Sequence, residues 1–413
     1  MRLRPHIVLA LVALFIVAAA LPLRAQKGPI KIGLVTPLTG GMAPNGKDTE
    51  NGLRLFLEEQ AYKIAGREVK LYAEDDEGKP ATGLTKARAL VEGQGVHLLF
   101  GPVSAAVGYA IAPYVDGKKV PTVYAIVAGE DITQRKRSPW IVRTGWASAQ
   151  PSHPFGEYAY KTLGYKRIAM IGYDFAFGWE VAGGFQRTFE EAGGQVVQKL
   201  WPPLFNPDYA PFITQLRGDV DAIYAVFSGG DALRFARQFA DSPLKGKIPV
   251  IAGGVYTDEH VLRTMGDEVL GVVSALHYSA ALDNPANRKF VTAYQAKFGT
   301  VPSYYSEGPY VTGYAVKAAI ESIGGDVENA EKLITAIRKV EMAQSPRGPI
   351  RFDEYGNPIQ NIYVRKVERV NGKLQNTVVH TFPAVSQFWR YKPDEFLKKP
   401  VYARDFPVCK HCQ

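Results

Sequence analysis

Short apolar stretches of the chain alternate with longer stretches in which only every third or fourth position is apolar. A run such as Ile30 to Val35 is typical of a strand buried in a parallel sheet, whereas Leu53, Phe56 and Leu57 share one face of a helix. Regular alternation of strands and helices predicts an α/β fold with parallel sheets and right-handed crossovers. The expected strands are 30–35, 69–74, 96–100, 120–129, 167–172, 195–200, 222–227, 249–252 and 270–275, with 348–353, 361–370 and 375–381 joined by tight turns.

This alternation is organised in two blocks. It runs through four strands, crosses at 140–144, begins again, and later returns to the first block. We expect two lobes and a tail, with residues 27–144 and 276–345 in one lobe, 145–275 and 346–400 in the other, and 401–413 beyond them. Repeated passage between the lobes favours a hinged clamp over two independent domains.

The first 25 residues have the layout of a secretory signal peptide. Met1 to His6 is basic, Ile7 to Leu21 is apolar and Ala25 is small, so we expect cleavage after Ala25 and a periplasmic protein. A retained membrane anchor is the alternative, although Pro22 ends a short apolar run. Cleavage would lower the net charge from +9 to about +6, and the scattered basic side chains favour anionic solutes over nucleic acid.

Both cysteines lie in the C-terminal sequence Cys409-Lys410-His411-Cys412-Gln413. Gln413 follows the second cysteine, which excludes the haem-attachment pattern. A zinc site would need further ligands besides His411. In an oxidising compartment a disulfide within the tail is favoured.

The stretch around Gly101 has the pattern of an anion site. The apolar run from Val96 to Phe100 stops at Gly101-Pro102, and Ser104 occupies the N-cap position before a helix of small residues. The free amides of the first helical turn and the Ser104 hydroxyl would face the carboxyl edge of the sheet. We therefore expect this corner to hold a ligand's carboxylate, with a role as helix cap alone as the alternative for Ser104.

The sequence lacks the motifs that would predict an enzyme. Gly41 to Asp48 nearly spells a phosphate-binding loop, but Asp48 stands where that motif needs Ser or Thr for Mg²⁺. A dinucleotide GxGxxG, a nucleophile-elbow GxSxG and an HExxH are absent, and His153, His260 and His277 are isolated. We expect a binding protein without catalytic residues, metal or cofactor.

Several motifs follow one another along the mature chain in a recognisable order. They are Ile32 to Gly40, Tyr72 to Asp76, Phe100 to Ser104, Asp208 to Phe212 and Gly348 to Asn357, after the export signal. Together they resemble the periplasmic substrate-binding proteins of branched-chain amino-acid type ABC importers. The resemblance implies a type I periplasmic binding protein, in which two Rossmann-like lobes, joined by three hinge crossovers, close around one small solute. It also implies a membrane permease as partner. We expect a monomer, and a periplasmic sensor is the alternative to a transport protein.

The resemblance also implies where a ligand is held. First-lobe contacts come from the loop after the first strand, the turn at 101–105 and the strand end at 126–128. Second-lobe contacts come from an aromatic before a glycine, the turn at 228–230 and a Gly-Gly loop. The expected contact residues are Asn45, Ser104, Ala105, Ile126, Val127 and Ala128 in the first lobe, Tyr173, Phe177, Ser228, Gly229, Val255 and Tyr256 in the second, and Tyr310 as a closing aromatic.

Two departures from the family pattern bear on the ligand. Val255 stands where amino-acid binders commonly have an acidic residue, and Ala128 where they often have Thr. Because a buried ammonium without a carboxylate partner is costly, we expect an aromatic or apolar acid without an amino group. Some relatives bind aromatic acids, and an aromatic cluster favours such a ligand here: it consists of Tyr173, Phe175, Phe177 and Trp179.

Two alternatives to this ligand remain open at the level of the sequence. The aromatic cluster could be ordinary packing within the lobe. Asp174 or Asp258 could instead pair with an amine, which would make the protein a binder of branched-chain or other amino acids or amides.

Overall fold

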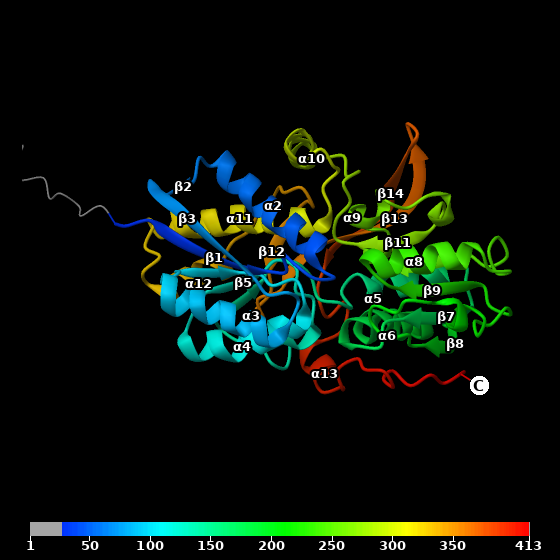
Figure 1. Ribbon diagram of the computed structural model, residues 1–413. Helices are drawn as coiled ribbons and strands as arrows, with labels where there is room; N and C mark the ends of the chain where they lie inside the picture. Colours follow the sequence, from blue (N-terminus) through cyan, green and yellow to red (C-terminus); the bar gives the residue numbers. More distant parts are fainter. Residues whose placement is uncertain (1–26, 413) are drawn as a thin grey trace, which may run out of the picture.

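The computed structural model describes residues 27–412 and shows two α/β lobes side by side (Figure 1). In this part of the chain the strands form one six-stranded and one eight-stranded sheet. Strand pairing is parallel through most of each sheet, and the antiparallel pairs lie toward the sheet edges. The predicted α/β fold with parallel sheets in two lobes is confirmed.

The first sheet has the strand order β2-β3-β1-β4-β5-β6. Its strands are β1 (Ile30–Thr36), β2 (Lys63–Ile64), β3 (Arg67–Asp75), β4 (Leu98–Phe100), β5 (Thr122–Tyr124) and β6 (Ile141–Arg143). Around it lie α2 (Ala43–Glu59), α3 (Pro80–Arg88), η1 (Ala89–Gln94), α4 (Ala105–Lys118), η2 (Glu130–Thr133), α10 (Pro285–Phe298), α11 (Tyr304–Ser322) and α12 (Ala330–Arg338). Helices α2 and α11 approach closely because Gly52 meets the Ser306 carbonyl group, where any side chain would collide.

The second sheet has the order β12-β13-β11-β10-β9-β7-β8, and β14 pairs with β13. Its strands are β7 (Arg167–Gly172), β8 (Gln195–Leu200), β9 (Ala222–Val226), β10 (Val250–Gly253), β11 (Val273–Leu276), β12 (Ile350–Phe352), β13 (Pro358–Val370) and β14 (Lys373–Val385). The helices are α5 (Ser152–Lys161), α6 (Ala176–Glu191), α7 (Ala210–Ile213), α8 (Gly229–Ala240), η3 (Gly254–Thr257), α9 (Glu259–Leu262), η4 (Asp267–Val269) and α13 (Pro393–Leu397). Ile223 and Ala225 of β9 join the core on one face of the sheet, and Tyr224 joins the core on the other, as strand geometry requires.

The predicted elements differ from the observed ones mainly at their ends. The strand expected at 120–129 ends at Tyr124, because the chain turns away there to line the space between the lobes. The strand expected from residue 270 begins at Val273. Helices α2 and α11 begin at Ala43 and Tyr304, and their first turns carry residues of the site described below.

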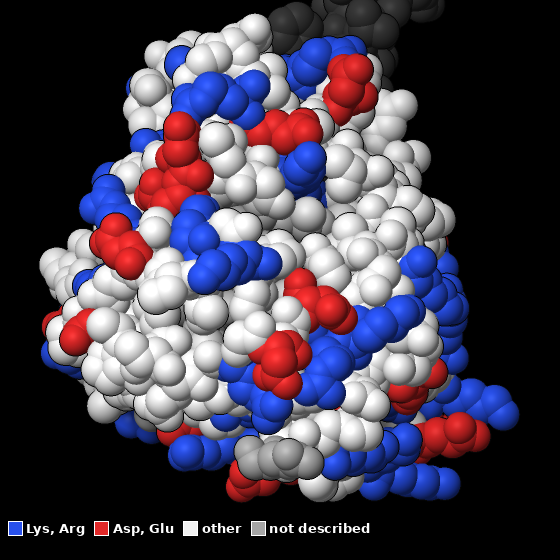
Figure 2. All heavy atoms as spheres, turned by 90° about the vertical axis from the view of Figure 1, so that its right-hand side faces the viewer, with Lys and Arg blue, Asp and Glu red and all other residues white. Residues whose placement is uncertain are grey.

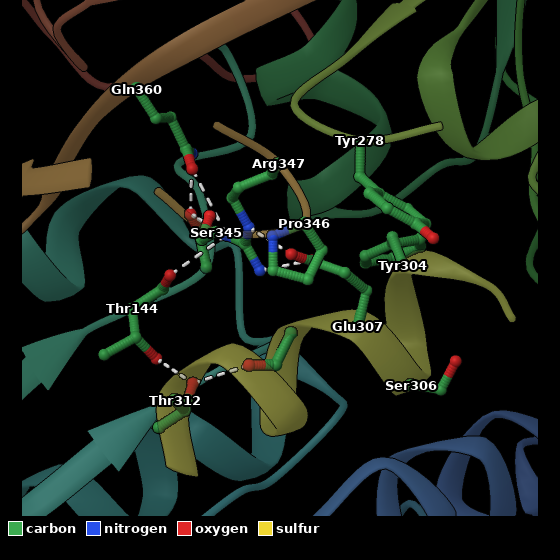
Figure 3. A network of polar contacts seen from close by, with 12 residues as sticks. Thr144, Tyr278, Tyr304, Ser306, Glu307, Thr312, Ser345, Pro346, Arg347 and Gln360 are labelled. Atoms are coloured by element: carbon green, nitrogen blue, oxygen red, sulfur yellow. Dashed lines mark hydrogen bonds and ion pairs between the residues drawn. The ribbon is translucent and has the colours of Figure 1, made fainter. Parts of the chain in front are cut away.

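Within residues 27–412 the chain passes between the lobes at 144–151, 277–284 and 339–349. A fully buried ion pair links two of these segments to α11 (Figure 3). Arg347 donates from Nε to Glu307 Oε1 (2.8 Å) and from Nη1 to the Thr144 carbonyl oxygen (3.1 Å) and Gln360 Oε1 (3.2 Å). One guanidinium therefore joins α11 of the first lobe, two crossovers and β13 of the second lobe.

The C-terminal tail contacts both lobes on its way to the end of the second (Figure 1). Arg135 of the first lobe donates to the Lys399 carbonyl oxygen at 2.5 Å and lies over the Phe396 ring. Further along, Cys409 and Cys412 form the predicted disulfide. On the end of the second lobe, Lys and Arg side chains are interspersed with Asp and Glu (Figure 2).

The predicted signal peptide at 1–25 lies outside the described residues. Across the described residues, every helix is too short or too polar to cross a bilayer.

Candidate ligand-binding cleft

A cavity of about 320 Å³ lies between the lobes, within the size range of small-molecule sites. The first lobe contributes Asn45, Val103, Ser104, Ala105, Ile126 and Ala128, the second contributes Tyr173, Phe175, Phe177, Ser228, Gly229 and Arg234, and the hinge side adds Trp146, Tyr304 and Tyr305. Residues from both lobes and from the segments next to the crossovers thus meet at one place.

On the first-lobe side, the N-terminus of α4 opens on the cavity. The backbone at Gly101 has φ +95 and lies against the Val35 carbonyl group, so glycine fits the turn between β4 and α4. Ser104 is the N-cap residue, and within the described part of the chain its side chain makes no capping hydrogen bond to the helix. Its hydroxyl and the amides of the first turn of α4 are therefore oriented to receive an anion.

On the second-lobe side, aromatic rings form the wall. Phe177 meets Trp146 edge to face, with ring centroids 6.0 Å apart, and Phe175 bridges from Phe177 (6.2 Å) to Tyr173 (5.3 Å). Tyr173 Oη donates to the Ser228 carbonyl oxygen (3.0 Å) and accepts from the Ser228 amide (3.1 Å), which fixes the turn before α8. Burial raises the pKa of Tyr173 well above its ordinary value, so this phenol stays neutral.

The two rims touch beside the cavity. Phe205 of the second lobe is 56% exposed, yet its ring lies so close to Gly41 that a Cβ on that glycine would be 3.2 Å from it. A side chain at position 41 would therefore push the Phe205 ring back by a few tenths of an ångström. The structure therefore represents the lobes drawn together over the cavity.

A second contact between the lobes has paired charges. Asp48 Oδ2 of α2 lies 3.4 Å from His260 Nδ1 and 3.7 Å from Arg263 Nη2, both near α9, and accepts from Ser303 Oγ at 2.8 Å. Burial alone would raise the pKa of Asp48, but His260 and Arg263 outweigh it, so that the pKa is lowered and the carboxylate stays ionised.

Acidic and basic side chains on the cavity wall are few. In the described residues they are Asp231, Arg234 and His260, all from the second lobe. Asp231 is 4% exposed, and its carboxylate accepts from Arg234 Nη1 (2.6 Å) and from the Phe205 amide (3.0 Å). The one carboxylate on the wall is thus already engaged by the protein.

Comparison with known proteins shows the family to which the chain belongs. Residues 29–373 match the family model described as periplasmic binding protein. The chain belongs to this family. It is 30% identical to the Leu/Ile/Val-binding protein homolog 6 of Brucella melitensis over 384 residues, which cover 91% of this chain and 96% of that relative.

Two solved structures illustrate the range of similar binding proteins. A solute-binding protein of an ABC transporter from Rhodopseudomonas palustris, in complex with 3,4-dihydroxybenzoic acid, has a TM-score of 0.83 and 35% identity, with 87% of this chain and 99% of that chain covered. A leucine-binding protein from Thermotoga maritima has a TM-score of 0.76 and 26% identity, with 86% and 99% covered. The predicted type I fold is confirmed, as is the prediction of a solute-binding protein of an ABC importer rather than an enzyme.

The cleft of this binding protein brings together most of the residues expected to contact a ligand. They are Asn45, Ser104, Ala105, Ile126, Ala128, Tyr173, Phe177, Ser228 and Gly229. They lie at the carboxyl ends of strands or at helix N-termini, where open α/β sheets bind ligands.

Four other predicted residues lie outside the cleft, which corrects that part of the expected set. Val127 points into the core below α4, and Val255 is packed in the core of the first lobe. Tyr256 lies in the second-lobe core beside Phe235, at 6.2 Å between ring centroids. The ring of Tyr310 packs on Phe290 (4.4 Å), and its hydroxyl donates to Glu59. Alternation of side chains along an extended segment directs Val127 away from the cavity, and the tight turn of η3 does the same for Val255 and Tyr256. Tyr310 lies further along α11 than Tyr304 and Tyr305, which reach the cavity.

Sequence reasoning missed Trp146, Tyr304, Tyr305, Phe205 and Arg234. Trp146 lies within the first crossover, and the two tyrosines lie in the first turn of α11. Their positions next to the hinge were a signal that the sequence offered. Phe205 and Arg234 reach the cavity only because the lobes and loops fold together, and the local sequence gives no sign of it.

The two aspartates considered as amine partners bind other groups of the protein. Asp174 accepts from Trp179 Nε1 (3.2 Å) and pairs with Arg404 (2.9 Å). Asp258 caps α9 and accepts from the Tyr304 amide at 3.2 Å. Both lie outside the set of residues that line the cavity in the described chain.

Proposed function

We propose that this periplasmic binding protein captures an aromatic carboxylate between its lobes and delivers it to the permease of an ABC importer. The observation that carries the proposal is the imbalance of charge in the cleft. Helix α4 presents unpaired donors to an anion, whereas Asp231, the one carboxylate on the described wall, is held by Arg234 and the Phe205 amide. An ammonium group would find no free partner here, and its burial would be unfavourable.

The aromatic wall supports a planar ligand. Rings of Phe175, Phe177 and Trp146 line the cavity, and such surfaces favour stacking or edge contacts with another ring. The structure from Rhodopseudomonas palustris holds 3,4-dihydroxybenzoic acid. We propose that the carboxylate of such a ligand lies at Ser104 and Ala105 and that its ring lies against Phe177.

The alternative ligand is a branched-chain amino acid. It is favoured by the names of the Leu/Ile/Val-binding relatives and by the leucine-binding structure. It would require a carboxylate partner for the ammonium, and the Asp231 oxygens already accept from Arg234 and from the Phe205 amide.

Ligand capture would act through closure of two lobes. We propose that residues 27–144 with 276–345 move against residues 145–275 with 346–400, in a monomeric periplasmic protein from which residues 1–25 have been removed. A ligand that contacts both lobes stabilises the closed form, because only the closed form offers all its contacts.

A panel of acids tests this proposal. The mature protein is heated with benzoate, 4-hydroxybenzoate, 3,4-dihydroxybenzoate, hexanoate, leucine and isoleucine, each at a concentration high enough to saturate a micromolar site. We expect the aromatic acids to raise the melting temperature, since a ligand at 1,000 times its Kd adds about 4 kcal/mol of stability. Stabilisation by leucine or isoleucine and by none of the aromatic acids would contradict the proposal.

A further inference from the structure

We infer that Arg234 is a specificity-determining residue that recognises a hydroxyl group on the ring of the ligand, at the end opposite to the carboxylate. This inference rests on the proposed function and deepens it, because it names the substituent that the second lobe selects. It concerns a residue that the sequence analysis did not single out.

Arg234 is held by one edge of its guanidinium only. Nη1 donates to Asp231 Oδ1 (2.6 Å) and to the Asn206 carbonyl oxygen (2.8 Å). Among the described residues, Nε and Nη2 take part in no hydrogen bond, and the side chain is 39% exposed although it lines the cavity. A planar guanidinium held through Nη1 keeps the N–H donors of two nitrogens, Nε and Nη2, for an acceptor in the cleft.

The partner of Arg234 is itself rigidly placed. Asp231 lies in the first turn of α8, is 4% exposed and accepts from the Phe205 amide at 3.0 Å. Asp231 and Arg234 together therefore tie the segment around Phe205 and Asn206 to α8. Their position is set by the protein before a ligand arrives, which is what selective hydrogen bonding requires.

The charges at this end of the cleft select for a hydroxyl group. Arg234 and Asp231 neutralise each other, so a second carboxylate on the ligand would meet the negative charge of Asp231 as well as the positive charge of Arg234. A phenolic hydroxyl can accept from Arg234 and donate to an acceptor nearby. The N-terminus of α4 differs from Arg234 in this respect, because no carboxylate lies beside the α4 donors on the described cavity wall.

The test is calorimetry with three ligands that differ at one ring position: benzoate, 4-hydroxybenzoate and benzene-1,4-dicarboxylate. They are titrated into the mature wild type, Arg234→Gln, Arg234→Lys and Arg237→Gln. Arg234→Lys keeps a cation for Asp231 but lacks the donors on Nε and Nη2. Because it retains the ion pair, it controls for a variant that merely fails to fold. Arg237 lies one turn further along α8, is exposed and contacts the Thr264 carbonyl oxygen, outside the cavity lining, so its variant is the matched control.

We expect wild type and Arg237→Gln to bind 4-hydroxybenzoate about tenfold more tightly than benzoate, and benzene-1,4-dicarboxylate no more tightly than benzoate. Both Arg234 variants should lose this preference, because 4-hydroxybenzoate should lose about tenfold more affinity than benzoate does. Equal weakening of both acids in Arg234→Lys would mean that Arg234 only positions the loop, and an unchanged preference would exclude it from recognition. Failure of the wild type to bind any of the three acids would refute the proposed function itself, a result distinct from either of these.

Discussion

The two walls of the cleft present different chemical groups to a ligand. The first lobe offers backbone amides, Ser104 and small side chains, whereas the second offers aromatic rings and the ion pair of Asp231 with Arg234. A helix N-terminus binds a carboxylate whatever is attached to it. Rings and a fixed guanidinium, in contrast, respond to the shape and substituents of the remainder of the ligand. We propose that the first wall selects for an acidic group and that the second wall selects among acids.

Adding a negative charge to the first wall should produce the largest effect on binding. Asp is as good a helix cap as Ser, so Ser104→Asp should fold normally while it repels the ligand's carboxylate. We expect affinity for every acid to fall by about 100-fold or more, since like charges in an interface cost several kcal/mol.

Calorimetry and a melting curve check this prediction together. Asn329→Asp, at the N-terminus of α12 and away from the cleft, is the matched control for a new charge at a helix cap. Retention of wild-type affinity by Ser104→Asp would place the carboxylate elsewhere.

Removing a ring from the second wall should give the next largest effect, and it should depend on the ligand. Phe177→Ala removes the ring that meets Trp146 edge to face, and we expect about 10- to 100-fold weaker binding of aromatic acids. Phe382→Ala, whose ring packs on Trp389 away from the cavity, controls for the loss of a phenylalanine. If aliphatic and aromatic acids lost affinity equally, the second wall would not be the discriminating one.

Loss of the contact between Asp48 and the pair His260 and Arg263 should weaken closure of the lobes without changing which ligand is preferred. Asp48→Asn breaks the pairing with His260 and Arg263, and we expect it to destabilise the closed form by about 1–3 kcal/mol, with all ligands weakened by a similar factor. The pKa of Asp48 is lowered from 3.8, so its contribution is fully present above pH 3.8 and is lost as the pH falls through the lower folded-state pKa.

Melting curves at several pH values test this dependence. The difference in melting temperature between wild type and Asp48→Asn should be constant near neutral pH and shrink below pH 3.8. A difference that grew on acidification would have the wrong sign for an ionised Asp48. Asp283→Asn, whose exposed carboxylate pairs with Arg288 within the first lobe, is the control.

Loss of the rim contact should have the smallest effect. Phe205→Ala removes a largely exposed ring that lies on Gly41, and we expect a weakening of about threefold, mainly through faster dissociation. Stopped-flow fluorescence of Trp146 would measure it. A larger loss than in Phe177→Ala would show that the rim, and not the wall, governs discrimination.

Local sequence was sufficient to predict the scaffold and the N-terminus of α4 in the first wall, whereas the family resemblance was needed to expect Tyr173, Phe177, Ser228 and Gly229 in the second wall. The alternation of strands and helices, and the junction from Phe100 to Ala105, depend on neighbours in the chain, so the pattern predicted their places. The second wall depends on packing between distant segments. Phe205 reaches the cavity from a loop, and Tyr256 is turned by η3 into the lobe core, so side-chain direction there could not be deduced from position in the chain.

A crystal structure of the mature protein with 4-hydroxybenzoate tests the central claim most directly. We predict a closed form in which the carboxylate accepts hydrogen bonds from Ser104 and the first amides of α4, the ring lies against Phe177, and the hydroxyl group lies within hydrogen-bonding distance of Arg234. A carboxylate bound to Arg234 instead, or a ligand outside the space between the lobes, would contradict the division of roles between the two walls.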